Sequence, residues 1–367
     1  MQLPVDVKAL IDEMTNIKAA RETELSVSVY IDEKAPADLI AHVRGAFAST
    51  SPTVRMALSY LDSSFYPRPV DDIAIVVAGE SATIGAATAA LRAVGVPTMV
   101  VTTLPEKVDS LAAEGGHAIP EGDLAYPTVD DSTVEPYPLD EAAAESLNER
   151  MGAWIVSACS DKQMAFAVAF PFMRRALAKE SVQITAVQNA GIGLVPLIPG
   201  ADLPIMTLNQ SKMLLKVAAA YGHELDKDRI KELLAVVGGA YACRTLARQL
   251  VEFVPVLGFI LRPTIAYGGT AAMGYAAIEY FEGDESVASV ASAAKNLPEK
   301  SMKWLMSSGD RFSTFAPGLV GKISDYVPMV RDKVSEYAPV VRDKVSEYAP
   351  KAIDLVSKVV VLPKAGD

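Results

Sequence analysis

The sequence predicts an α/β domain in its first half, then an all-α apolar module and, at the C-terminal end, an amphipathic helical repeat. Short runs rich in β-branched residues alternate with helical segments as far as about residue 104, which is typical of a parallel sheet with crossover helices. From Leu139 onward the chain turns helical, and no strand pattern of similar clarity occurs. We expect an α/β domain over 1–140, a helical domain over 141–285, linker helices over 286–325, the repeat over 326–358 and a tail over 359–367.

The composition argues against several classes of function. The 367 residues carry a formal net charge of −11, whereas a nucleic-acid binder needs a basic face. The two cysteines lie far apart and the three histidines are scattered, so neither a disulfide framework, a metal site nor a cofactor is expected. The first residues lack the basic and then apolar pattern of a secretory signal and read as an amphipathic helix. A cytoplasmic location is the expectation.

The first elements follow from periodicity. Residues 24–32 alternate polar and apolar side chains as a strand does, and Pro36 suits the first turn of the helix that follows. Residues 54–61 fit either a strand or a helix. Residues 72–78 form a continuous apolar run typical of a buried parallel strand.

The next elements complete a crossover unit. A helix rich in small residues is predicted after Gly79, and a further buried strand over 97–102. Strand, helix and strand in this order form a right-handed crossover. We expect a long loop over residues 115–139, which are rich in Gly, Pro, Asp and Tyr, and helices from Leu139 onward.

A crossover of this kind suggests a nucleotide site at the turn after the strand. A phosphate-binding loop needs backbone amides at a helix start and a lysine that reaches the phosphates. Here the glycines have the wrong spacing, no lysine follows, and Glu80 places a negative charge where a phosphate would lie. The dinucleotide fingerprint and the guanine-reading motif are also absent. The weak nucleotide candidates are Gly79, Ser81, Thr83 and Gly85.

The helical module begins with a mixture of Gly, Pro and large aliphatic residues over 189–204, which predicts a tight apolar connection between helices. Residues 208–221 form an amphipathic helix, and Gly222 fits its C-terminal cap. One or two helices are expected over 226–250. The run from Pro263 to Ile278 carries no charge.

Several motifs of this module occur in a distinctive order. They are Pro199-Gly200-Ala201-Asp202, Asn209-Gln210-Ser211-Lys212-Met213, Ala220-Tyr221-Gly222, Pro255-x-x-Gly258, Tyr267-Gly268-Gly269-Thr270-Ala271-x-Met273-Gly274 and Glu279-Tyr280-Phe281. Over about residues 165–282 the chain resembles the bacterial domain-of-unknown-function family number 697. The resemblance implies a helical, membrane-associated module that often follows an Era-like GTPase domain. The first half would then be a degenerate GTPase-like domain, since it lacks the GTPase motifs.

The same resemblance implies candidate residues for a family-specific interaction, but it implies no reaction and no catalytic residues. They are Asp202, Asn209, Gln210, Lys212, Tyr221, Gly222, Arg244, Arg248, Tyr267, Gly268, Thr270, Gly274 and Tyr280. Asp202 fits a helix N-cap, or a buried anchor for a partner or ligand. Arg244 and Arg248 share a helix face that either binds phosphate or lipid headgroups or is simply solvated and paired.

A membrane-spanning helix needs about 20 apolar residues, and the uncharged run ending at Ile278 is shorter. The module is therefore either a buried hairpin in a bundle or a shallow membrane hairpin.

Residues 326–358 contain an eleven-residue repeat, seen in YVPMVRDKVSE followed by YAPVVRDKVSE. Eleven residues make three helical turns, so each unit presents the same face, while one proline per unit predicts kinks. The apolar face consists of Tyr326, Val330, Val334, Tyr337, Val341, Val345 and Tyr348. The repeat resembles the lipid-surface helices of exchangeable apolipoproteins. The alternatives are a helix that packs on protein and a flexible stalk.

These observations favour a non-catalytic scaffold or adaptor at the inner face of the cell membrane. Its partner is expected to be a membrane surface, a membrane protein or another, unidentified protein, and not nucleic acid. Two alternatives are a nucleotide-dependent switch with an unorthodox site and a soluble, partner-binding helical protein.

Overall fold

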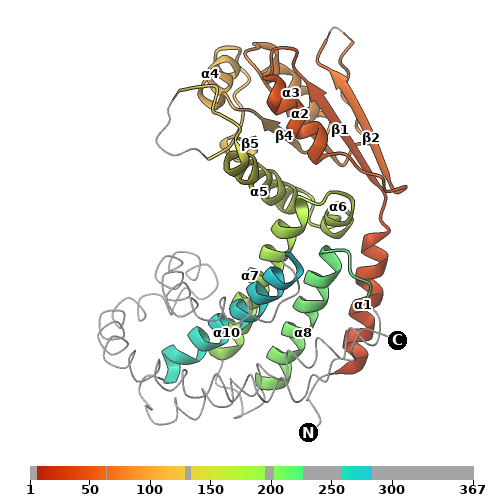
Figure 1. The fold of residues 1–367 in the computed structure, drawn as a ribbon, viewed down its shortest axis with the longest axis vertical. Helices are drawn as coiled ribbons and strands as arrows, with labels where there is room; N and C mark the ends of the chain where they lie inside the picture. Colours follow the sequence, from red (N-terminus) through yellow and green to blue (C-terminus); the bar gives the residue numbers. More distant parts are fainter. Residues whose placement is uncertain (1–5, 63, 129–133, 195–201, 226–257, 283–367) are drawn as a thin grey trace, which may run out of the picture. The chain divides into compact units, whose positions relative to one another are not determined.

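The computed structural model describes residues 6–62, 64–128, 134–194, 202–225 and 258–282 (Figure 1). Its strands are β1 (Leu25–Ile31), β2 (Val54–Tyr60), β3 (Ile73–Val77), β4 (Thr98–Val101) and β5 (Leu124–Ala125). Its helices are α1 (Val7–Arg21), α2 (Ala37–Ala46), α3 (Thr83–Ala93), α4 (Pro105–Glu114), the 3-10 helix η1 (Glu121–Asp123), α5 (Glu141–Ala158), α6 (Gln163–Ala169), α7 (Met173–Leu194), α8 (Asp202–Ala220) and α10 (Gly258–Glu282).

The described strands form a five-stranded sheet in the order β2-β1-β3-β4-β5, and every pairing is parallel. Val27 of β1 pairs with Met56 on one side and with Ile73 on the other. This order is that of the flavodoxin-like group of doubly wound sheets. The predicted α/β class with a parallel sheet is confirmed.

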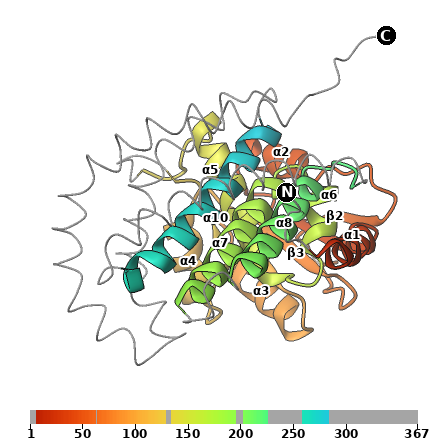
Figure 2. The same ribbon diagram turned by 90° about the horizontal axis from the view of Figure 1, so that it is seen from below.

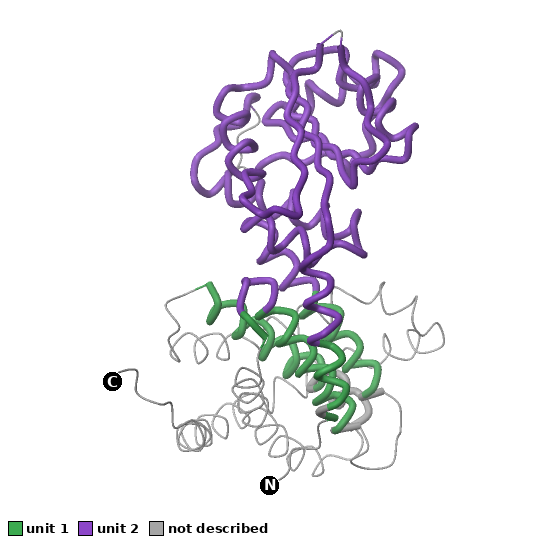
Figure 3. The backbone as a smooth tube through the Cα atoms, turned by 90° about the vertical axis from the view of Figure 1, so that its right-hand side faces the viewer, with its two compact units in different colours: residues 1–13, 181–218, 224–367 green, residues 14–180, 219–223 purple. Residues whose placement is uncertain are grey.

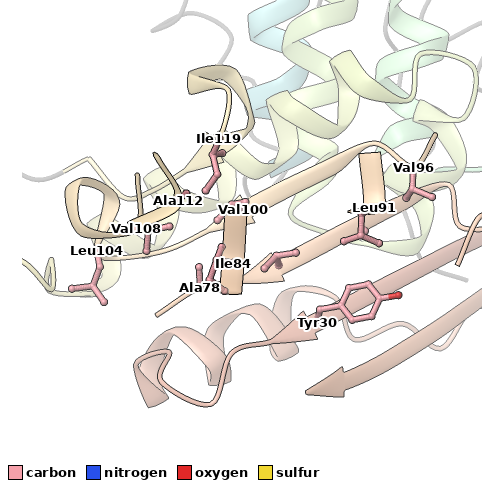
Figure 4. Close-up of a cluster of buried hydrophobic side chains, with 12 residues drawn as sticks. Tyr30, Ala78, Ile84, Leu91, Val96, Val100, Leu104, Val108, Ala112 and Ile119 are labelled. Atoms are coloured by element: carbon pink, nitrogen blue, oxygen red, sulfur yellow. The ribbon is translucent and has the colours of Figure 1, made fainter. Parts of the chain in front are cut away.

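Helices cover both faces of the sheet. α3 and α4 pack on the face that carries Tyr30, Val76 and Val100, and Figure 4 labels ten residues of this core cluster. α2 and α5 contact the other face, where the side chains of Val29, Ile75 and their neighbours are also fully buried. Burial on both faces explains why β3 and β4 read as continuous apolar runs.

The polar alternation of β1 has a structural cause. All seven residues of this strand are buried, including Ser26 and Ser28. Both serine hydroxyls donate hydrogen bonds to the carboxylate of Asp71, which is itself buried beside them. Because a buried polar group is costly unless it is bonded, the two serines and the aspartate stabilise each other's burial.

Several expectations about individual elements need correction. Residues 115–139 do not form one long loop, because η1 and β5 lie within them and β5 completes the sheet. The helix α4 was not predicted. Residues 54–61, which fitted a strand or a helix, form the strand β2.

The chain divides into two compact units (Figure 3). One, here called the sheet unit, contains residues 14–180 and 219–223, and the other, the helical unit, contains residues 1–13, 181–218 and 224–367. The sheet unit thus continues through α5 and α6, beyond the boundary that we expected near residue 140. The predicted connection over 189–204 is shorter than expected, because α7 continues to Leu194 and α8 begins at Asp202.

Within the described residues, no helix combines the length and the apolar character needed to cross a membrane. This holds for α10, which contains the uncharged run that ends at Ile278.

Candidate functional site

The carboxyl ends of the strands meet at one edge of the sheet, which is where doubly wound sheets bind ligands. The usual place is the crevice where the strand order reverses, here between β1 and β3. Asp32 directly follows β1 and Gly79 lies two residues after the end of β3. The segment from Gly79 into the first turn of α3 carries the weak nucleotide candidates of the sequence.

The side-chain carboxylate of Asp32 lies in this crevice. The residue is 6% exposed, and its backbone N–H donates to the carbonyl of Val77 at the end of β3. Its Oδ2 accepts a hydrogen bond from the N–H of Gly79 at 3.0 Å, and its Oδ1 accepts one from the N–H of Lys34 at 3.2 Å. An internal negative charge therefore already uses amide donors of the kind that would hold a phosphate.

Gly79 is held by a close approach of two backbone segments. A Cβ atom at this position would lie 2.2 Å from the carbonyl carbon and oxygen of Lys34. Gly85, inside α3, packs in the same way, because a Cβ atom there would lie 2.8 Å from the carbonyl oxygen of His117. Both glycines therefore serve the packing of the backbone.

Ser81 and Thr83 lie at the surface of the same turn. Their hydroxyl oxygens are 2.9 Å apart and hydrogen-bonded to each other. The four nucleotide candidates thus lie between the end of β3 and the first turn of α3; the two glycines are buried, and only this hydroxyl pair reaches the surface. No side chain caps the N-terminus of α3.

A second carboxylate closes the neighbouring helix start. Glu135 accepts hydrogen bonds from the N–H groups of Glu106 and Lys107, at 2.6 and 3.1 Å, in the first turn of α4. Tyr137 anchors the same segment by donating its N–H to the carbonyl of Thr103 after β4. Free N–H groups at a helix start favour anions, and here the anion is part of the chain.

The amino edge of the sheet carries a polar cluster that sequence reasoning did not identify. Lys162, between α5 and α6, places its Nζ 2.6 Å from Asp72 Oδ1 and donates to the carbonyl of Glu24. Asp72 also accepts from the N–H of Ser26. The two consecutive aspartates before β3 were the available signal, but nothing local identifies their partner 90 residues away.

Cys159 lies next to this cluster and is buried. Burial, and after it the nearby carboxylates of Asp72 and Asp161, raise the pKa of this thiol to about 12. The thiol is therefore protonated near neutral pH and is a poor nucleophile.

The helical unit contains a buried polar network that joins α7, α8 and α10, which lie side by side (Figures 1 and 2). Asn189 of α7 is fully buried; its amide nitrogen donates to Thr270 Oγ1 at 3.0 Å and lies 3.4 Å from the carbonyl oxygen of Met206. Asn209 donates to the Asn189 carbonyl oxygen at 3.0 Å, and Gln210 donates to Thr270 Oγ1 at 2.9 Å.

Three members of this network, Asn209, Gln210 and Thr270, were predicted from the family motifs, and the structure brings them together. Asn189 was missed, because in the sequence it only interrupts an apolar stretch. Thr270 also donates to the carbonyl of Ala266 one turn earlier, so its hydroxyl is bonded both as donor and as acceptor. The network holds three helices in one relative register, a role that buried polar groups perform in helix assemblies.

Other motif residues serve the packing of helices. A Cβ atom at Gly274 of α10 would lie 2.3 Å from a methyl carbon of Val182 of α7, so a glycine lets these helices approach closely. Lys212 pairs with Glu13 of α1 at 3.1 Å. Gly222 has a φ of +87° just after α8 and confirms the predicted cap.

The tyrosines of the motifs differ in their surroundings. Tyr267 is buried, and burial followed by the nearby Tyr275 raises its pKa to about 12. Tyr280 is half-buried and packs edge to face on Phe281, with ring centroids 5.2 Å apart. Tyr221 and Gly268 are also half-buried.

Some predicted residues have no described surroundings. Asp202 is the first residue of α8, where a helix N-terminus was predicted, but its side chain is outside the described set. Arg244 and Arg248 lie outside the described residues. So do all the residues of the predicted lipid-facing stripe, Tyr326, Val330, Val334, Tyr337, Val341, Val345 and Tyr348.

A hollow of about 320 Å³ lies beside α2. His42 and Asn148 are the polar side chains in its wall, and they are hydrogen-bonded to each other at 2.9 Å. Across the described ranges, no three His, Cys, Asp or Glu side chains are grouped so that they could hold a metal ion.

Comparison with known proteins adds no relative. No protein family matches the chain, no curated protein matches it, and no solved structure matches it. The resemblance to family 697 therefore rests on the order of the motifs alone.

Proposed function

We propose that the chain is a non-catalytic scaffold or adaptor that associates with the cytoplasmic face of a membrane. The observation that carries the non-catalytic part is that two carboxylates of the chain itself bond backbone amides at the carboxyl edge of the sheet. Asp32 uses the amides of Lys34 and Gly79, and Glu135 uses the first amides of α4. Because Gly79 also lies against the backbone of Lys34, a phosphate group would have to displace both a charge and a backbone segment.

The helical unit supports the adaptor part. The motif residues Asn209, Gln210, Thr270 and Gly274 fix the packing of helices instead of forming a reactive site. Close glycine contacts and hydrogen bonds between helices are also how helices associate in lipid, where apolar surface alone does not drive association. These features agree with the membrane-associated module that the family resemblance implies.

The C-terminal repeat supplies the proposed membrane contact. Its sequence puts tyrosines and valines on one helical face and balanced charges on the other, as in helices that lie in a lipid surface. The origin of the sheet unit as a degenerate GTPase-like domain belongs to the same proposal. The parallel sheet with helices on both of its faces supports this origin, as an arrangement that doubly wound nucleotide-binding domains share.

Titration calorimetry of the full chain with GTP and with ATP, each with Mg²⁺, tests the non-catalytic part. The expected result is no heat of binding and no shift in thermal unfolding with either nucleotide. Saturable binding with a dissociation constant below about 100 μM, about −5.5 kcal/mol, would overturn it and would favour the nucleotide-dependent switch. Flotation with liposomes tests the membrane part.

A further inference from the structure

The strand β2 lies at one edge of the sheet and, in the described part of the chain, pairs on one side only, with β1. Thr53 and Leu61, which flank β2, both direct backbone groups toward β1: the carbonyl of Thr53 accepts from Leu25, and the N–H of Leu61 donates to Ile31. Backbone groups alternate in direction along a strand. The groups that face the free edge therefore belong to Val54, Met56, Leu58 and Tyr60.

The edge strand and the loop that follows it in sequence carry exposed apolar side chains. Nine large hydrophobic residues are well exposed among the described residues, and four of them lie on β2 or on the loop that follows it. They are Leu58, Tyr60, Tyr66 and Val70, exposed by 46%, 44%, 69% and 65%. The strand itself contains neither lysine nor proline, the residues that usually protect an edge from pairing.

We propose that β2 pairs antiparallel with β2 of a second copy of this chain, across a two-fold axis at Ala57. In this register Val54 lies opposite Tyr60 of the other copy, and Met56 lies opposite Leu58. These are the residues whose backbone groups face the free edge, so each pair exchanges hydrogen bonds as an antiparallel ladder requires. A two-fold interface uses the same residues of both copies, here the seven residues of β2.

The distribution of apolar and charged side chains on β2 agrees with this register. Val54, Met56, Leu58 and Tyr60 share one face, so the axis at Ala57 joins the apolar faces of the two copies into one strip. Arg55 is the charged residue of the strand, and the register places it opposite Ser59 of the other copy. The two arginines then lie about 13 Å apart along the strands, which avoids direct repulsion.

Other registers fit less well. An axis at Met56 or at Leu58 keeps the alternation of the backbone groups but leaves residues at the strand ends without a partner. Pairing centred on Ala57 aligns all seven residues of each strand. The dimer would continue one sheet across both copies.

Substitutions at Ser59 test both the dimer and its register, since Ser59 and Arg55 are exposed and four strand residues separate their Cα atoms by about 13 Å within one copy. Ser59→Glu would create two opposite-charge pairs with Arg55 across the axis, and Ser59→Arg would create two like-charge pairs. Each charge pair should change the dimer dissociation constant roughly threefold. With two pairs, we expect a dissociation constant about tenfold lower for Ser59→Glu and about tenfold higher for Ser59→Arg than for the natural chain.

The measurement is sedimentation equilibrium of the full-length chain in buffer, with Ser110→Glu and Ser110→Arg as matched controls at an exposed position on α4. The proposal expects a reversible dimer whose affinity moves in opposite directions with the two charges at position 59 and by less than twofold with those at position 110. A natural chain that stays monomeric up to about 100 μM would overturn it. A dimer whose dissociation constant does not change with the charge at position 59 would also overturn it. The same holds if the charge at position 110 changes the dissociation constant as much as the charge at position 59 does.

Discussion

Replacing Asn189 by alanine should loosen the helical unit. The Asn189 side chain is fully buried and makes hydrogen bonds of 3.0 Å to Thr270 and 3.0 Å from Asn209. Two such bonds contribute about 1 kcal/mol each. The contact at 3.4 Å with the Met206 carbonyl is longer and adds little. The vacated space adds to the cost, whereas the better helix propensity of alanine offsets about 0.6 kcal/mol.

The partners limit the loss. Thr270 keeps its bonds with Gln210 and Ala266, and the half-buried amide of Asn209 can turn to water. The net cost is therefore about 2 kcal/mol, which corresponds to about 30-fold in the opening equilibrium of these helices.

Amide hydrogen exchange of the full chain, followed by mass spectrometry on peptides from α10, measures this opening directly. Asn189→Ala should raise the exchange of protected α10 amides by about 30-fold. The matched control is Gln188→Ala, since Gln188 is the exposed neighbour on the same helix turn and its change should stay within about twofold. Equal exchange in the two variants would refute the structural role of the network.

Three further predictions concern the stability of two glycine variants and the reactivity of the Cys159 thiol. Gly274→Ala should lower the free energy of unfolding by about 1–3 kcal/mol through its clash with Val182, and Val182→Ala in the same chain should recover part of this loss in thermal unfolding. Gly79→Ala should lower it by more than about 3 kcal/mol, because the clash at 2.2 Å is with backbone that has no room to move, as urea unfolding would show. In a Cys243→Ser background, Cys159 should react with a thiol reagent at pH 8 about a thousandfold more slowly in the folded chain than in urea, because its folded pKa is about 12. Because the folded pKa of Cys159 is raised, the folded state favours the neutral thiol. This contribution to the free energy of unfolding is fully present below the pKa of the unfolded thiol and is lost as the pH rises from that value toward 12.

The strands of the sheet were predictable because their local signal is strong. The segments 24–32, 72–78 and 97–102 exceed β1, β3 and β4, respectively, by one residue at either end. β5 has two residues, too few to show any period, and lies in a stretch rich in turn-forming residues. For α4 the signal was present, with Pro105 in its first turn and Val108 and Ala112 on one face, but no element was predicted between the strand over 97–102 and the loop that begins at residue 115.

The contacts of the site depend on long-range packing, which local patterns do not encode. The sequence marks Gly79 as unusual, yet the reason is the backbone of Lys34, which follows another strand. Asn189 and Thr270 are 81 residues apart, and only the packing of α7 on α10 brings them together. The family motifs identified Thr270 because they do not depend on local periodicity.

Flotation of the chain with liposomes tests the proposed membrane-associated scaffold most directly. The full-length protein and a version that ends at residue 317 are each mixed with neutral phosphatidylcholine vesicles and with vesicles that also contain anionic lipid. Because the charges of each repeat unit are balanced, the account predicts that the full-length chain floats with both kinds of vesicle and that the shortened chain floats much less. A full-length chain that stays at the bottom of the gradient with both lipids would contradict it.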